Sequence, residues 1–322
     1  MTNREIYQKT IGFSVRRILW DLLSLLIMGA AILAGALIDK NGVAGVLIGF
    51  LIGVVVMVVV TRFMSYIYKA GQIAMMTRGV TEGSLPDHVV AEGKKAVKER
   101  FATVAVYYAA TRVIRRIFSQ IGRGITKIGN SLGGDAGESI GSAISAVINV
   151  IVAYLCDCCL GWVFYRKDEK SVKATLQGAA LFFRHGKTFI KNMGRVFGLG
   201  LISLLLIGGA FFGVTLLIMR QLPQRIFVEI ATDLKTTLNV EKTAEWLYKA
   251  LTDPASLVIL ASAVAALLIW RFVHSSFVRP FVLVGVLRNY MKSGMEDAPK
   301  EDSYAAVAKL SPAFAKEMKN AA

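Results

Sequence analysis

Cysteine, histidine and proline are scarce in this sequence of 322 residues, which holds three cysteines, three histidines and six prolines. The cysteines, Cys156, Cys158 and Cys159, lie close together in one apolar segment. A disulfide framework needs cysteine pairs spread along the chain, so none is expected here. The Cys156-x-x-Cys159 spacing offers two ligands where a structural zinc site needs about four. We therefore expect small packing residues at these positions and no metal site.

The three histidines, His88, His185 and His274, are scattered along the chain. The sequence contains no H-E-x-x-H motif, no glycine-rich phosphate loop and no nucleophile elbow. These absences make an intramembrane hydrolase improbable. We expect a protein that is not an enzyme and that holds no cofactor.

Acidic residues are also few, because 22 aspartates and glutamates face 38 lysines and arginines for a net charge of +16. In a soluble protein this balance would indicate nucleic-acid binding. Here 55% of the residues are hydrophobic, the mean hydropathy is +0.54, and the basic residues lie mainly between long apolar runs. The sequence therefore predicts an all-α, polytopic transmembrane helix bundle that contacts anionic lipid headgroups and no nucleic acid.

Apolar segments long enough to cross about 30 Å of hydrocarbon need roughly 20 residues. The run from Ile18 to Ile38 is too long for a signal-peptide core of roughly 7–15 residues, so it reads as a first transmembrane helix. Asp253 and Pro254 are typical of an N-cap followed by proline at the first helical position, and Pro280 should kink or end that helix. The predicted spans cover residues 17–38, 43–66, 101–121, 140–164, 196–219 and 256–278.

The segment 101–128 is ambiguous, because it begins apolar and then carries Arg112, Arg116, Arg123 and Lys127 on one stripe. Most lysines and arginines fall on one side if both termini are cytoplasmic, as the positive-inside rule requires. This count favours six crossings in a plasma or inner membrane, although it leaves the basic stripe of 101–128 outside. The alternative is an interfacial helix over 101–128 followed by a re-entrant segment over 140–164.

Two polar regions complete the expected architecture. Residues 225–252 have apolar positions at helical spacing and gather acidic residues, which predicts an amphipathic helix or helix pair that caps the bundle outside the membrane. Residues 293–322 are polar and compatible with helix, which predicts a cytoplasmic tail.

Four polar residues within or near the apolar segments are candidates for a substrate pathway: Asp21, Asp157, Arg271 and His274. Three of them also have a purely structural interpretation. Asp21 would pair with Arg16 or Arg17, Asp157 would pair with an arginine of a neighbouring helix, and Arg271 would reach the inner headgroups. Glycines at small-xxx-small spacing should allow close helix packing, at Gly45, Gly49 and Gly53 and at Gly209 and Gly213.

The order of features from Phe101 onward resembles the choline transporter-like family of membrane proteins. The matching features are Val113-Ile114-Arg115, then LCDCCLGW, then Tyr165 through SVKATLQGAALFFRH, then GLISLLLIGGAFFGV and the last helix LLIWRFVHSSFVRPFVLVGVL. The resemblance covers roughly residues 101–292 and implies an organic-cation transporter. The sequence departs from the family at Val278-Arg279-Pro280, where an acidic residue is expected, and it lacks the large extracellular loop.

Two functions follow from this sequence. One is transport of a small solute, including an organic cation, through the helix bundle. The alternative is a non-transporting scaffold or regulatory subunit that binds other membrane proteins or a second copy of itself. Transport predicts an intramembrane acid that faces a water-filled cavity, whereas a scaffold predicts ion-paired acids and a dry core.

Overall fold

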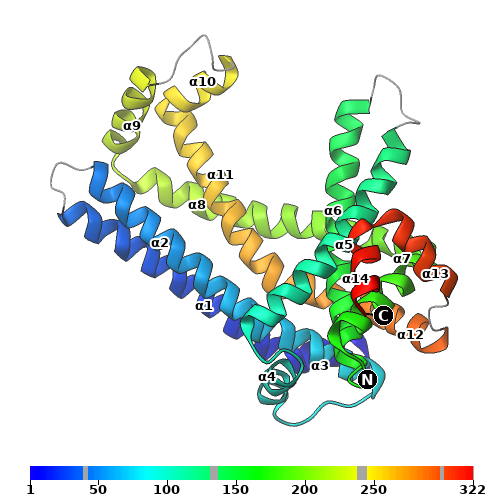
Figure 1. Ribbon diagram of the computed structural model, residues 1–322. Helices are drawn as coiled ribbons and strands as arrows, with labels where there is room; N and C mark the ends of the chain where they lie inside the picture. The colour runs from blue at the N-terminus through cyan, green and yellow to red at the C-terminus, as the bar shows by residue number, and fades with distance from the viewer. Residues whose placement is uncertain (39–42, 131–136, 238–244, 298–300, 322) are drawn as a thin grey trace. The chain divides into compact units, whose positions relative to one another are not determined.

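A computed structural model describes residues 1–38, 43–130, 137–237, 245–297 and 301–321 (Figure 1). Every regular element in these ranges is helical, so the predicted all-α class is confirmed. The first half of the chain contains α1 (Asn3–Ile38), α2 (Val43–Met64), the π-helical turn η1 (Ser65–Lys69), α3 (Ala70–Thr81), α4 (Val89–Arg100), α5 (Val104–Asn130) and α6 (Gly137–Tyr165). The second half contains α7 (Ser171–Ser203), η3 (Leu204–Gly208), α8 (Gly209–Gln221), α9 (Gln224–Thr237), α10 (Glu245–Thr252), α11 (Pro254–Val273), η5 (His274–Val278), α12 (Arg279–Glu296), α13 (Glu301–Leu310) and α14 (Pro312–Ala321).

The chain forms two compact units. Unit 1 comprises residues 1–197 together with 279–322, and unit 2 comprises residues 198–278. Each unit has its own buried apolar residues. Unit 1 is therefore assembled from both ends of the sequence.

Unit 1 contains a long hairpin of α1 and α2, which lie side by side (Figure 1). Glycines set the closest approach of these two helices. A Cβ atom built on Gly49 would overlap the backbone carbonyl of Ala31, and one on Gly53 would lie 2.9 Å from the Cα of Met28. Substituting these glycines would push the helices apart, because backbone atoms cannot move away as a flexible side chain can.

The core of unit 1 lies where α3, α6, α7 and α12 meet. Gly161 of α6 lets α3 and α12 approach, since a Cβ there would lie 2.8 Å from the Thr77 hydroxyl and 2.7 Å from Leu287. The Tyr290 hydroxyl of α12 donates a hydrogen bond to the carbonyl of Gly178 in α7. The N-terminal residues also belong to this core region, because Arg288 of α12 donates to the Asn3 side chain at 2.6 Å and to the Met1 carbonyl at 2.7 Å.

Unit 2 is built on the pair α8 and α11, which pack against each other. The Thr215 hydroxyl of α8 donates to the carbonyl of Ser262 in α11 at 2.9 Å, and Phe227 and Ala231 of α9 pack near Leu257 of α11. The predicted cap of α11 is confirmed. The Asp253 carboxylate accepts the backbone N–H of Ser256 at 2.9 Å, and proline occupies the first turn.

Four helical segments are long and apolar enough to cross a membrane: Asn3–Gly35, Ile48–Thr81, Gly198–Gln221 and Pro254–Glu296. They coincide with the predicted spans at 17–38, 43–66, 196–219 and 256–278. The length and apolar composition of these four helices indicate an integral membrane protein. The count of six spans is not confirmed. The predicted spans 101–121 and 140–164 are not among these four, and the apolar part of α6 that the structure describes is the shorter stretch Asn149–Tyr165.

Within the described residues, three π-helical turns interrupt the long helices, at Ser65–Lys69, Leu204–Gly208 and His274–Val278. The last of them explains how the fourth candidate span continues past Pro280 and does not end there. Proline cannot donate the backbone hydrogen bond of a regular α-helix, and the wider turn that precedes it accommodates the missing bond. Sequence periodicity did not predict these turns.

The regions predicted as cap and tail are both helical. Residues 225–252 form the helix pair α9 and α10, with 238–244 outside the described residues. The tail forms α13 and α14, which pack on α5, and Val307 and Phe314 are fully buried. The tail is therefore part of the folded body of unit 1.

Candidate functional site

The strongest polar cluster of unit 1 centres on Asp157 of α6. Its Oδ1 lies 2.7 Å from Nζ of Lys69, and its Oδ2 lies 2.5 Å from Nη2 of Arg279. The Asp157 side chain is 5% exposed, and each of the two cations is 26% exposed. One buried carboxylate therefore pairs with two cations from different helices, and the cluster keeps a net positive charge.

The positions of both cations follow from the π-helical turns. Lys69 is the last residue of η1, and Arg279 directly follows η5. A π-helical turn adds one residue to a helical turn and changes which side chains point toward a neighbouring helix. At these two turns, the side chains of Lys69 and Arg279 lie on the helix face that packs against α6.

Aromatic and backbone groups complete the surroundings of Arg279. Its guanidinium lies over the ring of Tyr154 at 5.3 Å, and its Nη2 also donates to the carbonyl of Ala153 at 3.1 Å. Tyr154 and Ala153 precede Asp157 by one helical turn on α6. The α6 surface thus binds the guanidinium through a carboxylate, a carbonyl and a ring face.

The cysteines beside Asp157 are free thiols. Cys158 and Cys159 are fully buried, and the Cys159 thiol contacts the carbonyl of Thr175 in α7 at 3.6 Å. Among the residues that the structure describes, no group of three or more histidine, cysteine or acidic side chains has the arrangement of a metal site. The described contacts of these thiols are those of side chains packed between α6 and α7.

Asp21 is the second buried acid of unit 1, with a relative exposure of 3%. Its nearest cation is Arg17, one turn earlier on α1, at 3.9 Å between Nε and Oδ2. Within the described part of the chain, Oδ1 of Asp21 has no hydrogen-bond partner. Asp21 is therefore held by a longer and less complete ion pair than Asp157.

Arg271 and His274 belong to unit 2, whereas Asp21 and Asp157 belong to unit 1. Nδ1 of His274 lies 3.0 Å from the hydroxyl of Ser203, and the indole N–H of Trp270 approaches the same hydroxyl at 3.3 Å. Arg271 is exposed. Of these two predicted pathway residues, His274 bonds to Ser203 at the end of α7, and Arg271 does not join this contact.

The two groups of glycines at small-xxx-small spacing differ in their contacts. Gly49 and Gly53 lie at the close contact of α1 and α2, and Gly45 lies against Gly35 in the same hairpin. A Cβ atom on Gly209 or Gly213 would meet nothing within 4 Å among the described residues of the chain. Within the described chain, only the group Gly45, Gly49 and Gly53 packs closely against another helix.

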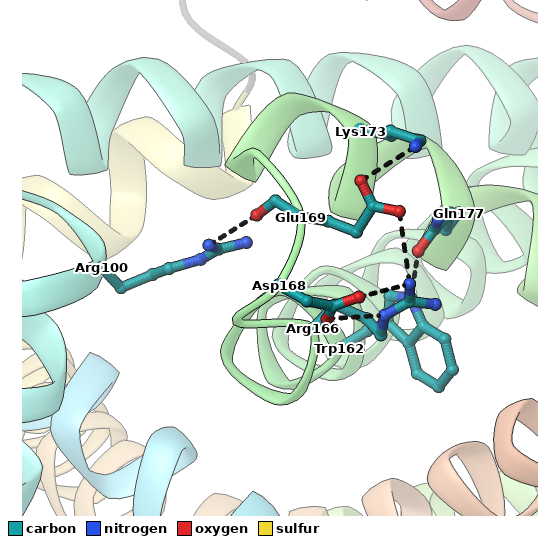
Figure 2. A network of polar contacts seen from close by, with 7 residues as sticks. All are labelled: Arg100, Trp162, Arg166, Asp168, Glu169, Lys173 and Gln177. Atoms are coloured by element: carbon teal, nitrogen blue, oxygen red, sulfur yellow. Dashed lines mark hydrogen bonds and ion pairs between the residues drawn. The ribbon is translucent and has the colours of Figure 1, made fainter.

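A second polar network joins the end of α4 to the turn between α6 and α7 (Figure 2). Arg100 donates to the carbonyl of Glu169 at 2.8 Å, and Arg166 binds Asp168 at 2.8 Å and Glu169 at 3.3 Å. Lys173 of α7 lies 2.9 Å from Glu169. The hydrogen bond from Arg166 lowers the pKa of Asp168, and burial lowers the pKa of Arg100. This network fixes the turn at the end of α6.

A pocket of about 490 Å³ lies next to this network, between α3, α4 and the end of α6. Its charged lining residues are balanced in sign: Arg78, Arg100, Lys167, Glu82, Glu92 and Glu99. Two of these charges neutralise each other, because Arg78 and Glu82 form an ion pair at 2.7 Å. The pocket does not include Asp21 or Asp157 in its lining.

Sequence reasoning did not identify Lys69 as a functional residue, because the predicted second span ends at residue 66. The structure continues this helix through Lys69 to Thr81. Comparisons with models of protein families, with curated proteins and with solved structures find no match to this chain.

Proposed function

We propose that this membrane protein is a non-transporting scaffold or regulatory subunit without catalytic activity. The observation that carries this proposal is that Asp157 is occupied by Lys69 and Arg279 of the same chain. An acid that serves a solute or a proton must be open to water and free to exchange partners. Asp157 is buried and binds a cation with each of its two carboxylate oxygens, which is the arrangement of an acid that holds helices together.

The pairing of the candidate spans supports the same conclusion. Within unit 1 the spans at Asn3–Gly35 and Ile48–Thr81 form a hairpin, and within unit 2 α8 packs on α11. Two helices in contact enclose no solute path. In the most apolar stretch of each span, only 11% to 18% of the residues are buried inside the chain. The remaining surface is available to lipid and to other transmembrane helices.

We propose that both ends of the chain lie in the cytoplasm. The contact of Arg288 with Met1 and Asn3 supports the placement of both ends on one side of the membrane. The predominance of lysine and arginine in the segments on that side supports its assignment as the cytoplasmic side.

Transport of a small solute is the second candidate. The observation that favours it is that π-helical turns lie beside polar side chains, at Ser65–Lys69 and His274–Val278, since such turns are frequent at functional sites. An organic cation, the solute class that the family resemblance implies, would have to displace Lys69 or Arg279 from Asp157. Transport thus requires this ion pair to open during the cycle.

The native cysteines beside Asp157 provide the test that separates the two functions. A membrane-impermeant maleimide is applied to sealed vesicles that contain the full-length protein, from each side in turn, and labelling is compared with that of detergent-denatured protein. A Ser84→Cys variant is the accessible control, because Ser84 is exposed in the turn before α4.

A scaffold predicts that Cys156, Cys158 and Cys159 react only after denaturation, while the cysteine at position 84 reacts in intact vesicles. Labelling of Cys156 or Cys158 in the folded protein at a rate near that of the control would show that water reaches Asp157. That result would overturn the scaffold proposal and support transport.

A further inference from the structure

The middle of α5 packs against the C-terminal tail and against α7. The side-chain oxygen of Gln120 accepts hydrogen bonds from the Ser311 hydroxyl at 2.6 Å and from the backbone N–H of Ala313 at 3.0 Å. The ring of Phe118 packs against Phe182 of α7 at 5.7 Å. All these residues belong to unit 1.

The segment before α5 contacts the chain near the start of α7. Arg100, shortly before α5, donates to the carbonyl of Glu169, which precedes α7. These contacts hold both ends of the stretch 100–120 against unit 1. Within the described residues, α5 is not among the four helical segments that are long and apolar enough to cross a membrane.

One face of this helix is strongly cationic. Arg112, Arg115 and Arg116 are exposed, and α5 contains no acidic residue in its sequence. The opposite face is buried, with Ile114, Ile117 and Phe118 each at most 1% exposed. The cations fall on one stripe because these positions repeat with the helical period.

We propose that α5 lies at the membrane surface without crossing it, and that its face formed by Arg112, Arg115 and Arg116 binds anionic lipid headgroups of the leaflet on the C-terminal side of the membrane. Two hairpins anchor the chain in this membrane, so the leaflet is present at high local concentration beside the helix. A cationic helix face at an anionic surface is attracted within about one Debye length, roughly 10 Å at 0.1 M salt. This inference does not depend on whether the protein transports a solute.

The placement also removes the conflict that a spanning helix created. A crossing over residues 101–121 would place Arg112, Arg115 and Arg116 within the hydrocarbon or toward the side of the membrane that carries few basic residues. Four crossings put them on the side that holds most of the basic residues, as the positive-inside rule requires. Charge complementarity with the anionic leaflet then favours lipid as the occupant of this face.

The test uses full-length protein with Ser119→Cys, since Ser119 lies on the same stripe and is half-buried. A fluorophore on this cysteine is read in nanodiscs that carry a nitroxide quencher on the lipid headgroup. The nanodiscs contain either phosphatidylcholine alone or a mixture with phosphatidylglycerol. The protein without the added cysteine is the blank.

We expect several-fold stronger quenching in the anionic nanodiscs, and loss of that difference in high salt or in the R112Q/R115Q/R116Q variant. The control variant R225Q/K235Q/K249Q removes the same charge from α9 and α10 and should keep the difference. Equal quenching in both lipids would overturn the proposal. Quenching that changes only when an acidic protein partner is added would do so as well and would assign the face to protein.

The side of the membrane is tested separately. In sealed vesicles of one orientation, an impermeant maleimide should label Ser119→Cys together with Ala305→Cys of the tail. It should not label Thr232→Cys of α9 in the same vesicles. Labelling of position 119 together with position 232, and not with position 305, would show that α5 crosses the membrane.

Discussion

Arg279 and Asp157 are joined by a contact of 2.5 Å between Nη2 and Oδ2, although 122 positions separate them in the sequence. This contact links the last long helix to α6. Because Lys69 binds the other oxygen of the same carboxylate, three helical segments of unit 1 share one acid.

Replacing Asp157 with asparagine should strongly destabilise the protein. The change leaves Lys69 and Arg279 close together without a counter-charge, and breaking a buried ion pair from one side costs about 3–5 kcal/mol. The measurement is the free energy of unfolding, or the thermal midpoint, of purified protein in detergent. Glu82→Gln is the control, since its ion pair with Arg78 is largely exposed and should cost at most about 1 kcal/mol. Equal midpoints for the two variants would show that the Asp157 cluster does not hold the helices.

Lys69→Gln should be milder than Asp157→Asn. It removes one of the two cations and leaves Asp157 and Arg279 as a matched pair with opposite charges. The same thermal assay ranks the two variants. If Lys69→Gln lowers the thermal midpoint as much as Asp157→Asn does, charge balance does not control the stability of this cluster.

Gly49→Ala should weaken the hairpin of α1 and α2. The added methyl group would overlap the carbonyl of Ala31, and overpacking typically costs about 1–3 kcal/mol. Gly29→Ala on α1 is the matched control, because a Cβ there meets no atom within 4 Å in the described structure. The control should be neutral or stabilising by up to about 1 kcal/mol, as alanine favours helix over glycine. Thermal midpoints in detergent distinguish the two substitutions, and a lower midpoint for Gly29→Ala would contradict the packing argument.

The N-cap of α11 should lose strength in acid. Hydrogen bonds from Ser256 lower the pKa of Asp253 in the folded protein. A lowered folded pKa means that the stabilisation is fully present above the unfolded pKa, near 3.8, and is lost as the pH falls through the folded value. At neutral pH the wild type should therefore have a higher thermal midpoint than Asp253→Ala. The difference between the two midpoints should shrink below about pH 4. A difference in thermal midpoint that stays constant as the pH falls below about 4 would exclude the Asp253 carboxylate as its source.

Much of the membrane architecture could be predicted from the sequence, because long apolar runs and the Asp253-Pro254 cap are local signals. The predicted span at 101–121 is not confirmed, because the apolar stretch at the start of α5 ends at Ala110. The residues that bury this helix, such as Phe182 and Phe314, come from distant segments. Local hydropathy cannot show that protein and not lipid covers an apolar face.

The candidate site was predictable only in part. Burial of Asp157 beside a cation followed from the cost of an unpaired charge in an apolar segment. Its partners did not follow, since Lys69 and Arg279 reach α6 through π-helical turns that have no signature in the hydrophobic pattern. The ion pair of Asp21 with Arg17 was easier to foresee, because both residues lie one turn apart on a single helix.

The division of unit 1 between the two ends of the sequence has a consequence for biosynthesis. The ribosome makes α1 and α2 first and α12 last, and all of unit 2 is made between them. The ion pairs and hydrogen bonds of Arg279 and Arg288 can therefore form only after nearly the whole chain has emerged. Until then Asp157 has Lys69 as its only partner within this cluster, so the nascent protein holds a one-to-one ion pair while unit 2 is made, and Arg279 adds the second cation last.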